Sequence, residues 1–287
     1  MLSYTNLLSI YQDFTNNTTS VNQTNGAIYI NQAVRDICNK RNWSFLEDTL
    51  TDVTVASTQE YLLPYNLKKL INCSITVSST KWTPSEINNK TDWDNLNATA
   101  NYSDQVDNFY IYAGKINFYP IPSTADNVIR YNYIKAIRDV SVADYTTGTV
   151  TMTNASKTVT GSGTAFTALM VGRYIRATND GYWYKISAFV SATELTLEKA
   201  FQGTTAGSLA FAIGEMTVLP EGYEMLAVYK SAIYYFTGKD QEKVTRFTDL
   251  YKELYQDLER EYGSKTTSVV LEDDDYSFNN PNLYITA

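Results

Sequence analysis

A strong helical period determines the fold of this chain, and it runs through residues 220–263: PEGYEMLAVYKSAIYYFTGKDQEKVTRFTDLYKELYQDLEREYG. We expect one helix to begin at Pro220-Glu221 and to stop at Gly238, since glycine suits the residue after a helix end. One apolar stripe has spacings of three and four residues: Leu226, Tyr229, Ile233 and Phe236. A second stripe makes more than half of the surface apolar, which is typical of a helix buried on several sides: Met225, Val228, Ala232 and Tyr235.

Asp240 is placed to cap the next helix, which we expect to end at Gly263. Its apolar residues form a narrow seam between charged positions, and such a seam indicates a helix that packs along one line. The seam consists of Val244, Phe247, Tyr251, Leu254 and Leu258. The end of the chain therefore predicts two helices that need partners.

The partners are predicted at the other end of the chain. Ser3 can cap a helix whose apolar residues have helical spacing: Tyr4, Leu7, Leu8, Tyr11 and Phe14. The polar run from Thr15 to Asn25 should interrupt it, and a second helix is expected from about Ala27 to Lys40. The apolar stripe of that helix is Ala27, Ile30, Val34, Ile37 and Cys38.

The residues between these helices have β character. Alternating apolar and polar residues predict strands in 46–145, with a hairpin turn at Ala113-Gly114-Lys115 and a long surface excursion over 81–105. Residues 146–215 are rich in Thr, Gly and β-branched residues, with closely spaced turn signals, which favours a small β-sandwich or barrel.

We therefore expect an α+β fold: a helical bundle of N- and C-terminal helices with an inserted antiparallel β-sheet and a small β-sandwich or barrel domain. The predicted divisions are helices in 1–45, a β-rich segment in 46–145, an inserted β-domain in 146–215, helices in 216–263 and an extended tail in 264–287. The bundle packing residues should be Ile30, Val34, Ile37, Leu226, Tyr229, Ile233, Phe236, Phe247, Tyr251, Leu254 and Leu258.

The composition argues against most kinds of active site. The 287 residues include no histidine, which excludes Ser-His-Asp and Cys-His nucleophiles and His-ligated metal sites. Cys38 and Cys73 lie far apart, and we expect each to pack as a small buried side chain. We predict no catalytic residue, no cofactor and no metal, although paired carboxylates for glycoside hydrolysis cannot be judged from sequence.

The charge and hydropathy point away from nucleic acid and membranes. The 23 Lys and Arg against 31 Asp and Glu give a net charge of −8, so the chain lacks the cations that neutralise phosphates. The sequence contains no apolar stretch long enough to span a bilayer. The first residues, MLSYTNLLSIYQ, lack a basic region, so we expect no signal peptide and synthesis in the cytoplasm.

Aromatic residues are the candidates for binding. The chain has 24 tyrosines and four tryptophans. Tyr182, Trp183 and Tyr184 are predicted on the outer surface of the β-domain, where alternation would place the tyrosines on one face and Trp183 on the other. Tyrosine and tryptophan are enriched at protein–protein contacts. We favour that interpretation over a sugar-stacking surface.

The tail after Gly263 combines the acidic run Glu272–Asp275 with apolar residues that are unusual for a solubilising terminus. It cannot bury enough apolar surface to fold alone. Either it is a frayed end or it becomes ordered on a partner, through Tyr276, Phe278, Leu283, Tyr284 and Ile285.

Several segments, in this order, resemble head-to-tail connector (adaptor) proteins of tailed bacteriophages: INQAVRDICNKRNWSFLEDT, EYLLPYNLKKL, INFYPIPS, IRYNYIK and LPEGYEMLAVYKSAIYYF. The segment that begins GTVTMTNASKTVTGSGTAF resembles a β-domain inserted in such proteins. The resemblance extends from about Ala27 to Tyr262, rests on order and texture, and excludes the tail.

The resemblance implies a non-enzymatic virion protein at the head–tail junction. Such proteins form a homo-oligomeric ring, usually a dodecamer, under the portal protein and offer a platform to tail or tail-fibre proteins. DNA then passes through the lumen without specific binding, which fits an acidic chain. The tail of this chain would dock on the portal. The alternatives are a tail-tube or baseplate subunit, or a carbohydrate-binding module of a host-recognition apparatus.

Overall fold

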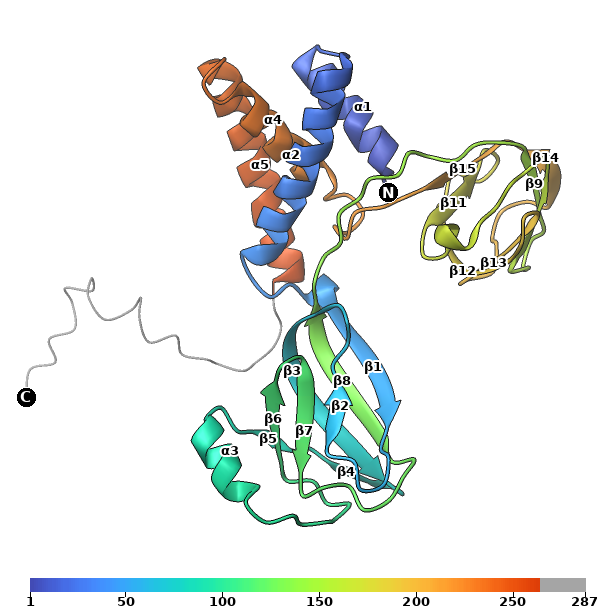
Figure 1. Ribbon diagram of the computed structural model, residues 1–287. Helices are drawn as coiled ribbons and strands as arrows, with labels where there is room; N and C mark the ends of the chain where they lie inside the picture. The colour runs from blue at the N-terminus through green and yellow to red at the C-terminus, as the bar shows by residue number, and fades with distance from the viewer. Residues whose placement is uncertain (264–287) are drawn as a thin grey trace, which may run out of the picture.

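The computed structural model describes residues 1–263 and confirms the α+β class (Figure 1). Four helices, which we call the helical unit, pack together although they come from the two ends of the chain. Figure 1 shows a first β unit beneath them and a β insert that projects to one side. The helical unit consists of α1 (Tyr4–Thr15), α2 (Ser20–Asn39), α4 (Met225–Phe236) and α5 (Gln241–Tyr262).

Helix α2 begins seven residues before the predicted start at Ala27, at Ser20. The Thr19 side chain caps it by accepting a hydrogen bond from the backbone N–H of Asn22. Asn22 is itself buried, where its amide donates to Thr15 Oγ1 at 2.9 Å and its oxygen accepts from the Tyr11 hydroxyl at 3.2 Å. The polar run therefore interrupts the helices only over residues 16–19, and from Ser20 it forms helix with the buried Asn22 satisfied inside the α1–α2 hairpin.

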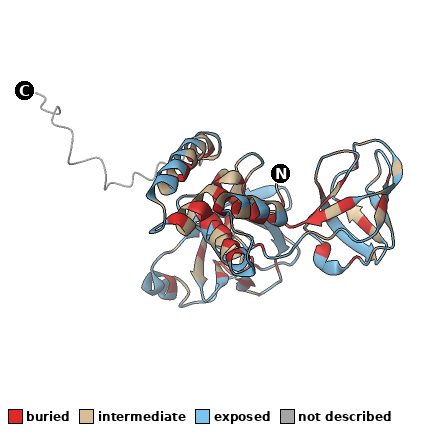
Figure 2. Cartoon of the chain, turned by 90° about the horizontal axis from the view of Figure 1, so that it is seen from above, coloured by how far each residue is buried: buried red, intermediate tan, exposed pale blue. Residues whose placement is uncertain are grey.

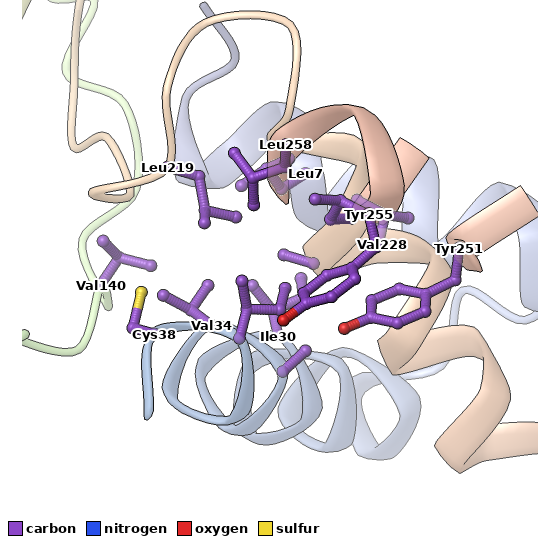
Figure 3. Close-up of a cluster of buried hydrophobic side chains, with 14 of the residues drawn as sticks. Leu7, Ile30, Val34, Cys38, Val140, Leu219, Val228, Tyr251, Tyr255 and Leu258 are labelled. Carbon is purple, nitrogen blue, oxygen red and sulfur yellow. The ribbon is translucent and has the colours of Figure 1, made fainter. Parts of the chain in front are cut away.

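The core of the helical unit contains side chains from all four helices (Figure 3). Leu7, Ile30 and Val228 are fully buried there, and Tyr251 comes from the long last helix. Val140 and Leu219, from the two segments that lead to and from the β insert, close one side of this core.

The first β unit consists of two sheets with a core between them. One sheet has the antiparallel order β1-β8-β3-β4, and the other has the order β2-β7-β6-β5 with β5 parallel to β6. Ala113 and Gly114 both have positive φ, which confirms the predicted hairpin turn between β6 and β7. The strands are β1 (Glu47–Val53), β2 (Glu60–Leu62), β3 (Leu67–Val77), β4 (Thr80–Trp82), β5 (Ser85–Glu86), β6 (Asn108–Tyr112), β7 (Lys115–Tyr119) and β8 (Val128–Lys135). A 3₁₀ turn, η1 (Ser44–Leu46), precedes them.

Residues 81–105 are more ordered than the predicted surface excursion. They contain the short strand β5 and helix α3 (Lys90–Leu96), which Asn89 caps by accepting from the backbone N–H of Thr91. Trp93 is buried and stacks on Tyr110, with ring centroids 5.6 Å apart. Trp93 therefore anchors the polar segment on the second sheet.

The β insert is one seven-stranded sheet with the order β14-β9-β10-β13-β12-β11-β15, curled around its own core. Figure 2 shows it beside the rest of the molecule, joined by two chain segments. The strands are β9 (Thr149–Met152), β10 (Thr158–Ser162), β11 (Tyr174–Ala177), β12 (Tyr184–Ser191), β13 (Glu194–Leu197), β14 (Ala206–Leu209) and β15 (Phe211–Gly214). A 3₁₀ turn, η2 (Ala168–Met170), lies before β11.

Candidate functional site

The predicted bundle packing residues all lie at the helix–helix contacts. Eight are buried in the two clusters of the helical unit: Ile30, Val34, Ile37, Leu226, Phe236, Phe247, Tyr251 and Leu258. Tyr229, Ile233 and Leu254 are partly buried against the same clusters. These side chains hold the four helices of the chain together.

A polar cluster joins α2 to α4 and α5. The Tyr234 hydroxyl donates a hydrogen bond to the Asp36 carboxylate, and Lys230 Nζ lies 3.3 Å from an Asp36 oxygen. The Lys230 ammonium also lies over the Tyr251 ring, at 5.4 Å from the centroid. Burial and the hydrogen bond to Asp36 raise the pKa of Tyr234, and burial raises the pKa of Tyr255 to about 12. The cluster thus aligns the helices through neutral phenols and one paired carboxylate.

Glu215 fixes the segments that join the β insert to the helical unit. It is only 5% exposed, and its carboxylate accepts hydrogen bonds from the backbone N–H groups of Ser141 and Val142 at 2.8 and 2.9 Å. Arg138 completes the set at 2.5 Å. Three donors satisfy this buried carboxylate, so it clamps the outgoing and returning segments together.

The beginning of α1 is part of the same junction. The Ser3 hydroxyl donates to Asp144 at 2.8 Å, and Tyr4 N–H donates to the Glu215 carbonyl at 2.8 Å. Gly214 leaves no room for a side chain there, because an added Cβ would lie 2.7 Å from Ser3 Cβ and 3.2 Å from Trp183 Cη2. The insert is therefore seated against the N-cap of α1 by close backbone packing.

A groove of about 610 Å³ lies on the outer face of the β insert. Tyr174 pairs directly with Lys185 across β11 and β12, so both side chains share a face. Lys185 Nζ lies 2.7 Å from the Glu198 carboxylate, and the Arg176 guanidinium stacks 4.7 Å from the Trp183 ring centroid. The groove is lined by Tyr174, Tyr182, Trp183, Tyr184, Lys185, Glu198, Lys199, Ala200 and Gln202.

The prediction that Tyr182, Trp183 and Tyr184 all lie on the outer surface is wrong for Tyr184. Strand β12 begins only at Tyr184, so the alternation does not extend back to Tyr182. Tyr184 is 8% exposed, packs on Phe201 and donates its hydroxyl hydrogen bond to Asp180. Tyr182 lies in the irregular segment before the strand and is 70% exposed, while Trp183 is half-buried.

The Lys185–Glu198 ion pair of the groove and the Glu215 carboxylate of the junction were not predicted from the sequence. Lys185 and Glu198 are thirteen positions apart and meet only because Glu198 follows the neighbouring strand β13. Hydrogen bonding between them raises the pKa of Lys185 and lowers that of Glu198, so both stay charged near neutral pH. Glu215 sits in a stretch with no motif, and its role depends on two segments about 75 residues apart.

The predicted docking residues of the tail, Tyr276, Phe278, Leu283, Tyr284 and Ile285, lie outside the described residues. Within 1–263 no group of three or more His, Cys, Asp or Glu side chains could hold a metal ion. No helix in that range is long and apolar enough to cross a bilayer. Cys38 and Cys73 are both buried and unbridged, as expected, and burial raises the pKa of each thiol to about 12.

The comparisons with known proteins give one family. A family model described as SU10 adaptor protein matches residues 3–157, which is more than half of the chain. The match covers α1, α2 and the first β unit, and it stops shortly after β9. The comparison with curated proteins gives no match.

Proposed function

The chain belongs to the SU10 adaptor protein family, a family of phage head-to-tail adaptors, and from this we propose that its copies form a ring between the portal and the tail. It is a structural component of a phage particle. The match over residues 3–157 carries the proposal. We propose a homo-oligomeric ring of twelve subunits that offers DNA a conduit.

The outer face of the helical unit supports the ring. Val21 and Ile28 are seven residues apart on α2, so they lie on one face, and both are largely exposed. Exposed apolar residues on one helix face can provide the centre of a subunit contact. We propose that this face of α2 contacts the next subunit, while the buried stripes of α2, α4 and α5 keep each subunit rigid.

The ring can be tested by native mass spectrometry and negative-stain imaging, with and without the portal protein. We expect rings with a central hole when the portal is present. A Val21→Asp, Ile28→Asp double variant should fold but fail to form rings. Leu169→Asp, at an exposed apolar residue of the β insert, is the matched control and should assemble. Normal rings from the double variant would contradict the proposed contact.

The acidic charge supports a conduit without specific DNA binding. A chain at −8 lacks the surplus of cations that would hold phosphates, so the genome can slide past it. Electron cryo-microscopy of the assembled ring would locate the residues of the lumen. A strongly basic lumen would contradict this part of the proposal.

The tail after Gly263 is proposed to dock on the portal. The support is its sequence, which combines five large apolar residues with an acidic run. A segment of this kind orders when it binds a partner. Deletion of 266–287 should abolish portal attachment and leave the unfolding of the subunit unchanged. A truncated chain that binds the portal at full affinity would refute this role.

The β insert is proposed to face outward or towards the tail, where it offers a surface to tail or tail-fibre proteins. Its projection from the side of the molecule supports this placement (Figure 2).

A further inference from the structure

We propose that the groove on the β insert binds a neutral pyranose unit of a glycan. This activity is separate from ring formation and goes beyond the role of an adaptor. The groove volume of about 610 Å³ lies in the range of small-ligand sites, and such sites combine an apolar lining with a few convergent polar groups.

The aromatic lining suits a sugar ring. Four aromatic side chains contribute to the groove, and the most exposed of them is Tyr182. The C–H face of a pyranose packs on an aromatic ring much as other flat apolar surfaces do. Trp183 is held in place by the Arg176 guanidinium and by its close approach to Gly214, so this part of the groove is formed before a ligand arrives.

The charged groups suit hydroxyls better than an anion. Lys185 and Glu198 neutralise one another at 2.7 Å, yet about half of each side chain remains exposed. The pair thus offers N–H donors and carboxylate acceptors side by side, and each sugar hydroxyl can both donate and accept. The Gln202 side chain adds an amide at the same rim. A ligand read by hydroxyls therefore matches the groove.

A single-stranded nucleic acid fits the groove less well than a neutral sugar does. Single strands also stack on aromatic rings, but their binding depends on a groove of unpaired cations. Here the Lys185 ammonium is paired with Glu198, and Arg176 lies on Trp183. Among the lining residues Lys199 alone therefore adds a cation without an ion pair to a described residue, and one such cation is not a charged groove. A protein partner would require a broad, flat contact, whereas this lining is concave and small. Single-stranded DNA is therefore tested beside the glycans in the experiment.

The test applies the fluorescently labelled full-length protein to an array of neutral and acidic glycans. The strongest neutral trisaccharide is then titrated by calorimetry at low and high salt. We expect binding to neutral glycans that salt leaves unchanged, because the ligand itself carries no charge. Binding confined to acidic glycans or to single-stranded DNA, and lost in high salt, would overturn the proposal.

Tyr182→Ala should weaken the trisaccharide about ten-fold, which corresponds to about 1.4 kcal/mol. Glu198→Gln should also weaken trisaccharide binding, since a carboxylate with two acceptor oxygens becomes an amide with one. The matched control is Tyr65→Ala, which removes a fully exposed tyrosine of the first β unit and should change nothing. Tyr182 is preferred to Trp183 because Trp183 also packs on Gly214. Failure of the array, or equal affinities for all variants, would refute the site, whereas ring formation is measured separately.

Discussion

The helical unit and the β insert each have a closed apolar core, but they differ in how far apart along the chain the core residues lie. The helical core joins Leu7 and Ile30 to Val228 and Tyr251, so it closes only when residues near the two ends of the chain meet. The buried residues of the insert core all lie within 150–213, and Tyr145 packs against them from the connecting segment. An insert with its own core can fold within the chain, and its loss need not disturb the helices.

The junction shows how two such parts stay in a fixed relation. Tyr145 and Ile213 exchange two backbone hydrogen bonds, so the chain leaves and returns at neighbouring points. Glu215 and the N-cap of α1 then hold both segments. We therefore expect the helical unit and the β insert to respond differently to pH, to substitution and to excision of the insert.

Alkaline pH should have the largest effect, and it should act on the helical unit. Burial raises the pKa of Tyr11, Tyr234 and Tyr251 above the ordinary value of 10.0, and that of Tyr255 to about 12. The unfolded phenols ionise first, so their contribution to stability is complete below pH 10 and is lost as the pH rises through 12.

Among the tyrosines of the insert, a raised pKa is found for Tyr184. We therefore expect the far-UV circular dichroism of the helices to disappear while amides of the insert remain protected from hydrogen exchange. Simultaneous loss of both signals at one pH would show that the two parts unfold together.

Trp43→Ala should destabilise the helical unit by about 3–5 kcal/mol. Trp43 is fully buried, donates its indole N–H to the Ile37 carbonyl at 2.8 Å and packs edge-on against Tyr255. Urea unfolding followed by circular dichroism measures the loss. Trp82→Ala, on the short strand β4, serves as the control and should cost much less.

Leu195→Ala should cost about 2–5 kcal/mol within the insert alone. Leu195 is fully buried on β13, which pairs with β10 on one side and β12 on the other. Hydrogen exchange by mass spectrometry should show faster exchange in 149–214 and unchanged exchange in α2 and α4. Spread of the effect into the helices would contradict the independence of the insert.

Gly26→Ala should destabilise the α1–α2 hairpin by about 1–3 kcal/mol, although alanine is the better helix former. An added Cβ would lie 2.5 Å from the Tyr11 ring and 2.9 Å from Leu8 Cδ1. The melting temperature measures the change. Gln23→Ala, at an exposed position on the same helix, should be neutral or slightly stabilising, and equal effects would exclude a steric cause.

Excision of the insert should have the smallest effect on the helical unit. Replacing 148–211 by a short Gly-Ser linker keeps Tyr145, Ile213 and Glu215 in place. We expect the free energy of unfolding of the helices to change by less than about 1 kcal/mol, because the entropy cost of closing a loop depends only weakly on its length. Glycan binding, measured on the same variant, should disappear. A large loss of helix stability would mean that the insert supports the unit.

Local sequence patterns were sufficient to predict the elements with strong periods. The stripes of α4 and α5, the Ser3 and Asp240 caps and the turn at Ala113-Gly114 follow from spacing and local chemistry, which neighbours along the chain decide. Their order also indicated that helices from the two ends must meet. Local patterns did not predict where α2 begins, because its polar first turns depend on Tyr11 and Thr15 of another helix.

The junction and the groove could not be predicted from local patterns, because both are formed by residues that are far apart in the chain. Glu215 is a clamp because two distant segments place their N–H groups around it. Lys185 meets Glu198 because of strand pairing, and Tyr182 is exposed because β12 begins two residues later. Such contacts depend on pairwise geometry between remote residues, whereas sequence periods report only the face that each element buries.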